Sequence, residues 1–359
     1  MKPSVTAGSA DDPPELQGPE SSGTRWGDKR ARGAGEVSPR PPALKRSRQI
    51  GSAAGSLAVV GSYILMIVVF AVAAPHSFLD VGNVKNVLDQ AVVPVLLVCG
   101  LTFVLAAGEF DLSFTAVVGL SAGIVVKLIV GGLPIGLAIA ISILTAVAIG
   151  LVVGVVVAFG RVSSFIITLA MSSILIGLEQ ALTGNATINQ LPAAYSSLAS
   201  NKLLGVHAPV WIAVVVAALA ALLLHGTRFG RHAKASGANP TAAFLAGVKL
   251  RHVKVACFVI VAALSSLGAV ILTSRASSYY PNSSSGFLLS SYAAVFLGAA
   301  AGRSGGFTIL GSVFGVMWLT TLENGLVLTN QPAWFSNVVE GLILSAAVLL
   351  AAWSRRSDR

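Results

Sequence analysis

The sequence is poor in charge and in the residues that build metal sites or disulfide frameworks. Only 11% of its 359 residues are Asp, Glu, Lys or Arg, whereas 55% are hydrophobic. A soluble domain carries about 25% charged residues. The two cysteines, Cys99 and Cys257, lie inside apolar runs, and the five histidines are scattered. These shortages exclude a soluble enzyme, which needs a more polar surface, and they predict no disulfide and no metal site.

The sequence also lacks the motifs of a nucleotide-binding or catalytic protein. It contains no G-x-x-x-x-G-K-[ST] segment, so it cannot hold the phosphates of ATP by itself. It has no nucleophile–base constellation, which argues against a membrane enzyme and predicts neither catalytic nor cofactor-binding residues. The net charge of +10 would suit nucleic acid. Because Lys and Arg also accumulate in the cytoplasmic loops of membrane proteins, we expect no nucleic-acid partner.

Long apolar runs are abundant instead, and the mean hydropathy is +0.81. Runs of about 20 apolar residues cross a bilayer as α-helices. The fold class is therefore all-α, a polytopic membrane protein with about ten transmembrane helices. The candidate spans lie at 54–74, 87–107, 112–130, 134–158, 164–183, 209–225, 255–274, 288–301, 306–325 and 335–353. Two alternatives stay open: the second and third spans could form one discontinuous unit, and 288–301 could be broken or re-entrant.

The charges outside these runs predict the orientation. With ten spans both termini lie on one side, and a cytoplasmic position for them puts most Lys and Arg inside, above all in the loop 226–254. Residues 1–50 are rich in Pro, Gly and Ser and predict a disordered cytoplasmic tail, whose last basic residues would contact anionic membrane lipid. A transmembrane domain, 51–354, and a basic cytoplasmic C-terminus, 355–359, follow.

The loop 226–254 has the chemistry of a short helix. Asn239 is a good N-cap, Pro240 suits the first helical position, and Gly247 can end the helix in the left-handed conformation. Such a helix exposes Phe244 and Leu245 on the cytoplasmic face and needs the groove of a partner. The alternative is a solvated basic loop.

Four segments share their order and spacing with a known family. The loop TRFGRHAKASGANPTAAFLAGVKLRHVK follows the pattern T-x-x-G-R, then G-x-N-x-x-A-A, then a small residue, Gly and an aliphatic residue. AGEFDLS follows G-G-I-D-L-S, SSFIITLAMSSILIGLEQALTG follows P-F-I-x-T-L, and LENGLVL follows N-N-G-L. The chain thereby resembles, over nearly all of 55–353, the permease subunits of ABC transporters of the ribose/xylose/galactose type.

The resemblance implies a transport subunit without chemistry of its own. Such permeases form the membrane pore, usually as two copies. They bind a cytoplasmic ATPase, which holds the ATP, and receive the solute from an external binding protein in the bacterial cytoplasmic membrane. The residues implied in ATPase coupling are Arg231, Gly237, Asn239, Ala242, Ala243, Phe244 and Gly247.

Polar residues inside or beside the spans are the candidates for the solute pathway, because carboxylates and amides at membrane depth are costly. They are Asp111, Ser113, Asn282, Glu323 and Asn324. Asp111 could instead cap a helix that starts at Leu112, and Asn282 could belong to an ordinary turn. Glu179 and Glu340 lie nearer helix ends, where they would reach the interface.

Two departures from the family pattern bear on the solute. Glu109 stands where the pattern has its second Gly, and Leu288 and Ser290 stand where it has an acidic pair. We expect a monosaccharide or similar polyol. Permeases for branched-chain amino acids or nucleosides share much of the pattern, and an ion-coupled secondary transporter is the alternative from another class.

Overall fold

The computed structural model describes residues 59–160, 162–302, 306–332, 334–339, 341–343 and 345. All described residues belong to the second of two units of the chain, Lys45–Arg359. The predicted tail 1–50, the C-terminus 355–359 and Glu340 lie outside the described residues. The cytoplasmic position expected for both termini therefore stays a prediction.

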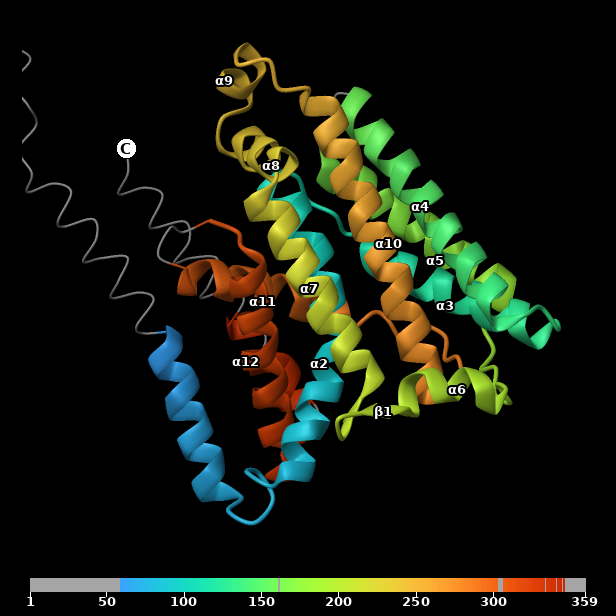
Figure 1. Cartoon of the computed structure of the whole chain (residues 1–359), viewed down its shortest axis with the longest axis vertical. Helices are drawn as coiled ribbons and strands as arrows, with labels where there is room; N and C mark the ends of the chain where they lie inside the picture. Colours follow the sequence, from blue (N-terminus) through green and yellow to red (C-terminus); the bar gives the residue numbers. More distant parts are fainter. Residues whose placement is uncertain are drawn as a thin grey trace, which may run out of the picture. The chain divides into compact units, whose positions relative to one another are not determined.

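The second unit is built almost entirely of helices, which are connected as Figure 1 shows. An apolar helix, Val59–Ala73, comes first. It is followed by α2 (Val81–Ala106), α3 (Phe114–Val130), α4 (Ile135–Phe159), α5 (Ser164–Thr183), α6 (Ala193–Ser200), β1 (Lys202–Leu203), β2 (Val206–His207), α7 (Ala208–Gly226), α8 (Arg228–Ala238), α9 (Pro240–Leu245), α10 (Leu250–Ala276), α11 (Phe287–Ala301) and α12 (Ile309–Leu328).

The helices confirm an all-α polytopic membrane protein. Among the described residues, α2, α4, α5, α7 and α10 are long and apolar enough to cross a bilayer, and Val59–Ala73, α3 and α11 are shorter apolar helices. Residues 107–113 separate α2 from α3, and α11 runs without a break, so 288–301 does not lie in a broken helix.

The helix α2 lies at the centre of this unit. It packs against α7, α10, α11 and α12, and 78% of its most apolar window is buried. It begins at Val81 rather than at residue 87, because the Asp80 side chain accepts a hydrogen bond from the Gly82 N–H at 2.7 Å and caps it. Polar residues in its first turns hide that start from a hydropathy reading. The outer helices α5 and α7 bury only 17% and 22% of their windows.

Glycine lets neighbouring helices approach closely at two G-x-x-x-G pairs, Gly150 with Gly154 and Gly311 with Gly315. A methyl group added at Gly154 in α4 would lie 2.9 Å from the Val255 Cα of α10. A methyl group added at Gly311 in α12 would lie 2.6 Å from the Gly298 carbonyl oxygen of α11. Because real side chains essentially never approach so closely, neither position accepts even alanine without a shift of a backbone.

The segment between α5 and α7 contains structure that the sequence reading did not predict. There, α6 precedes the antiparallel hairpin β1–β2, in which Lys202 pairs with His207. Tyr195 of α6 is buried, and its hydroxyl donates to the Val270 carbonyl at 3.0 Å. His207 Nδ1 lies 2.5 Å from Asp89 Oδ2 of α2. These contacts fasten this end of the bundle, opposite to α8 and α9, to α10 and α2 (Figure 1).

Candidate solute pathway and coupling segment

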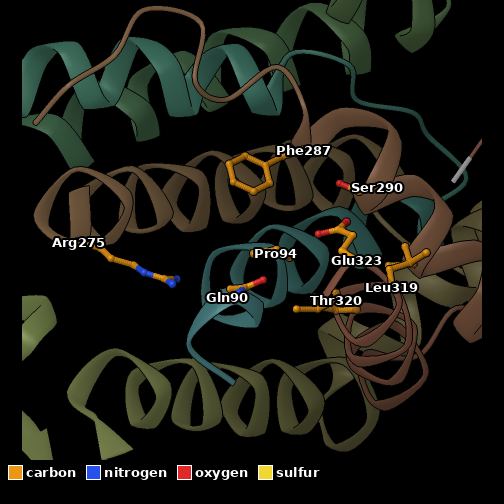
Figure 2. Close-up of a pocket in the computed structure, with 10 residues that line it drawn as sticks. Gln90, Pro94, Arg275, Phe287, Ser290, Leu319, Thr320 and Glu323 are labelled. Carbon is orange, nitrogen blue, oxygen red and sulfur yellow. The ribbon is translucent and has the colours of Figure 1, made fainter. Parts of the chain in front are cut away.

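A cavity of about 230 Å³ lies where α2, the end of α10, α11 and α12 meet (Figure 2). Its polar lining residues are Gln90, Arg275, Ser290, Thr320 and Glu323. Its apolar lining residues are Pro94, Phe287, Ala294, Val316 and Leu319. The volume is below the roughly 300–1,000 Å³ of pockets for drug-sized ligands, so it suits a smaller solute.

The polar side chains offer both donors and acceptors of hydrogen bonds. In Figure 2 the Gln90 amide, the Arg275 guanidinium and the Glu323 carboxylate point toward one space. Arg275 Nη1 donates to the Asp89 carbonyl oxygen at 2.8 Å, which holds this side chain across to α2. A guanidinium only donates, a carboxylate only accepts, and an amide does both. Together they can bind a solute that carries several hydroxyl groups.

Pro94 interrupts the helical hydrogen bonding of α2 beside this cavity. It lies inside α2 and has no N–H, so it cannot donate the helical hydrogen bond to the Gln90 carbonyl four residues earlier. Gln90 and Pro94 both line the cavity. The proline thereby frees a backbone acceptor from the helix at this part of the membrane-spanning segment.

Glu323 and Asn324 were both pathway candidates, but the structure separates them. Glu323 lines the cavity. Asn324 is buried elsewhere, in a reciprocal amide pair with Asn83 of α2. Asn83 Nδ2 donates to Asn324 Oδ1 at 2.9 Å, and Asn324 Nδ2 donates to Asn83 Oδ1 at 3.0 Å. Asn83 also donates to the Phe78 carbonyl. Asn324 therefore joins α12 to α2 and to the preceding loop.

Asp111 and Ser113 are buried in the turn between α2 and α3, and neither lines the cavity. Asp111 Oδ1 accepts from the Ser113 N–H at 2.7 Å and from the Ser113 hydroxyl at 2.6 Å. The helix α3 begins at Phe114, two residues later than expected, and the Asp111 carboxylate accepts from the backbone just before it. The Tyr292 hydroxyl of α11 donates to the Asp111 carbonyl at 2.7 Å and accepts from its N–H at 3.1 Å.

Asn282 is exposed in a turn of the loop between α10 and α11, with a positive φ of 59°, and does not line the cavity. Its N–H lies 3.5 Å from Glu179 Oε1, which also accepts from the Tyr279 hydroxyl at 2.7 Å. Burial, together with this hydrogen bond, raises the pKa of Tyr279. Glu179 is only 4% exposed in this chain, so the expectation that it reaches the interface is wrong. It packs against Gly119 of α3.

The coupling segment, α8 and α9 with residues 246–249, confirms the predicted helix signals. Asn239 Oδ1 accepts from the Ala242 N–H at 3.0 Å, Pro240 is the first residue of α9, and Gly247 has a φ of +82°. Ala243 is buried, whereas Phe244 is 67% exposed and Leu245 80% exposed. The short helix therefore presents two large apolar side chains that nothing in the described part of this chain covers.

The longer helix α8 was not predicted. The Thr227 hydroxyl accepts from the Gly230 N–H at 3.3 Å and caps it. Arg231 is exposed, and burial lowers the pKa of Lys234. Gly237 contacts the backbone of the α2–α3 turn: a methyl group there would lie 2.9 Å from the Gly108 nitrogen. Packing inside this chain therefore requires glycine at position 237. Ala242, another residue implied in coupling, is exposed in α9.

These features define a multi-pass membrane permease with a polar cavity and a short helix, α9, that exposes two large apolar side chains. A family model described as "Branched-chain amino acid transport system / permease component" matches residues 83–348, and the chain belongs to this family. It is an integral protein of the bacterial cytoplasmic membrane.

The relatives of the chain are sugar permeases. A ribose import permease protein of Bacillus subtilis is 36% identical over 81% of this chain and 90% of its own length. An L-arabinose transport system permease protein of Escherichia coli is 34% identical over 74% of this chain and 80% of its own length. An L-arabinose ABC transporter permease protein of Azospirillum brasilense is 30% identical over 79% and 83%. No solved structure matches the chain significantly.

Proposed function

We propose that this chain is the membrane-spanning permease subunit of an ATP-binding cassette importer for a monosaccharide of the ribose or arabinose type. The observation that carries the proposal is the family match over 83–348, which includes both the cavity and the coupling segment. The curated names of the relatives supply the solute class.

The chain performs no catalysis of its own in this proposal. A separate cytoplasmic ATPase subunit binds ATP and receives Phe244 and Leu245 in a groove. The energy of hydrolysis enters as a movement of α8 and α9, which alters the relative stability of two arrangements of the helices. An external binding protein delivers the solute at the opposite end of the bundle.

A second copy of the permease completes the pathway. The helix α5 exposes large apolar side chains on two sides and buries mainly a stripe that ends at Glu179 and Thr183. Membrane lipid or a second copy can cover such a surface, and small and polar groups favour association between helices. We expect a homodimer in which lipid covers the remaining apolar faces.

The cavity lining favours a polyol over the alternatives. Gln90, Ser290 and Thr320 provide neutral groups that both donate and accept, which suits hydroxyl groups. A branched-chain amino acid would bury an aliphatic side chain and leave such polar groups without partners, at a cost of about 1–3 kcal/mol each.

The test is uptake into proteoliposomes that contain the permease, its ATPase and the binding protein encoded beside it. We expect ATP-dependent uptake of radiolabelled ribose, arabinose or xylose, and none of leucine or adenosine. An ATPase with its P-loop lysine replaced by alanine is the control and should abolish uptake. Uptake driven by a proton or sodium gradient without ATP would refute the proposal, and ATP-dependent uptake of leucine alone would correct the solute.

A further inference from the structure

The turn between α2 and α3, residues 107–113, carries an ion pair that the pathway and docking roles do not use. Lys254 Nζ of α10 contacts Glu109 Oε1 of the turn. The pair is largely buried, since the Glu109 side chain is 14% exposed and the Lys254 side chain 26%. Lys254 lies in the first turns of α10, directly after the coupling segment.

The same turn also touches the coupling segment itself. Gly108 has a φ of +81°, and a methyl group added to it would lie 3.0 Å from the Gly237 Cα at the end of α8. The two backbones are therefore in contact, and α9 begins three residues after Gly237. A displacement of α8 and α9 consequently meets the turn directly at Gly108 and, through the start of α10, at Glu109.

On its other side the turn is fastened to α11, which lines the cavity, and to α5. The Asp111 backbone exchanges two hydrogen bonds with the Tyr292 hydroxyl of α11. The Phe110 N–H donates to Ser164 Oγ at 3.1 Å, and the Leu112 N–H donates to Thr168 Oγ1 at 3.0 Å, both in α5. Because α11 contributes Phe287, Ser290 and Ala294 to the cavity, the turn joins the coupling segment to a wall of the cavity.

The ion pair lets the contact between the turn and the start of α10 resist separation as well as compression. A glycine–glycine contact resists compression, but it does not resist separation. A largely buried ion pair resists separation, because parting the charges leaves each of them poorly solvated. The Glu109 carboxylate also lies by the N-terminal turns of α10, where the helix dipole favours a negative charge.

We propose that Glu109 and Lys254 are positioning residues that make the α2–α3 turn follow the coupling segment, so that ATPase-driven movement reaches α11 and the cavity. This inference rests on the proposed importer function. In this inference the Glu109–Lys254 pair determines how efficiently ATP hydrolysis drives transport, whereas Phe244 and Leu245 bind the ATPase.

The test compares single and double charge reversals in the complete transporter in proteoliposomes. The readout is the number of solute molecules imported per ATP hydrolysed, measured beside co-purification of the ATPase. Glu109→Lys and Lys254→Glu should each lower this ratio about tenfold, which corresponds to about 1.4 kcal/mol of coupling free energy. Both variants should still retain the ATPase. The double variant Glu109→Lys/Lys254→Glu should restore the ratio to within about twofold of the unmodified chain.

Lys127→Glu is the matched control, because Lys127 is an exposed cation in the last turn of α3, outside the coupling segment, and its charge reversal leaves the pair intact. It should keep the ratio unchanged. Single variants with an unchanged ratio, or a double variant that stays as poor as the singles, would overturn the inference. A Glu109→Gln chain that fails to assemble would show a purely structural pair and would also overturn it. Failure of the unmodified chain to bind any ATPase would instead refute the importer function.

Discussion

Asn324 and Glu323 are neighbours in α12, and their substitution should have different consequences. Asn324→Ala should destabilise the fold and leave solute affinity unchanged in the chains that fold. Glu323→Gln should weaken solute affinity. The reason is that only Glu323 lines the cavity, whereas Asn324 is bonded to Asn83.

The size of the stability effect follows from the amide pair. Asn324→Ala removes two side-chain hydrogen bonds, of 2.9 and 3.0 Å, and leaves the half-buried Asn83 amide with only its bond to the Phe78 carbonyl. A buried polar group without its partner costs about 1–3 kcal/mol. Asn83→Ala removes the same two bonds and should cost a similar amount. The double variant should therefore cost much less than the sum, with a coupling energy of roughly 0.5–3 kcal/mol.

The assay is the free energy of unfolding in mixed micelles, measured by titration with a denaturing detergent, together with the KM for solute uptake. Glu323→Gln should raise KM by roughly 10- to 150-fold, because a hydrogen bond to a charged group contributes about 1.5–3 kcal/mol. Thr329→Val, which removes a bond within the end of α12, serves as a control for helix stability alone.

Two results would refute this reasoning. Strictly additive losses for Asn83→Ala and Asn324→Ala would mean that the amide pair does not form in the membrane. A raised KM for Asn324→Ala, without a change in stability, would return this residue to the pathway and place the cavity elsewhere.

The remaining predictions concern the coupling segment and the topology. Phe244→Ala should weaken association with the ATPase by about 30- to 1000-fold, because a buried aromatic hot spot contributes roughly 2–4 kcal/mol. Co-purification of the ATPase at the level of the unmodified chain would contradict this prediction. Arg231→Ala should weaken association less, since exposed charges are screened by salt. Cysteine introduced at Leu245, 80% exposed, should react with a membrane-impermeant maleimide only in inside-out vesicles, and cysteine at Leu204, 83% exposed in the hairpin, only in right-side-out cells. The buried Cys99 and Cys257 should remain unlabelled in both, and external labelling at residue 245 would reverse the orientation.

Local chemistry made the helices and the coupling segment predictable. Each long apolar run in the described residues is a helix, because a chain in lipid satisfies its backbone groups only within itself. The cap at Asn239, the proline at 240 and the glycine at 247 act within one turn, so their roles can be read without the rest of the chain.

Short polar elements were missed because their stability comes from contacts far away in the sequence. The helix α8 had one usable signal, Thr227 as a cap followed three residues later by Gly230. The helix α6 and the hairpin depend on Tyr195 with Thr273 and on His207 with Asp89. These partners lie 78 and 118 residues away, and no local pattern announces them.

The pathway residues show why depth in the membrane does not identify a solute contact. The sequence locates Glu323 and Asn324 at the same depth, yet consecutive helical residues point about 100° apart, at 3.6 residues per turn. Because α12 is apolar around most of its circumference, no amphipathic face shows which direction leads to the cavity. The direction of the Asn324 side chain is set by Asn83, which lies 241 residues away in the sequence and forms a hydrogen bond with the Asn324 amide between α2 and α12. A polar residue in a membrane helix therefore has to be assigned by its position in the fold: Asn324 and Asp111 form hydrogen bonds away from the cavity, whereas Glu323 lines it.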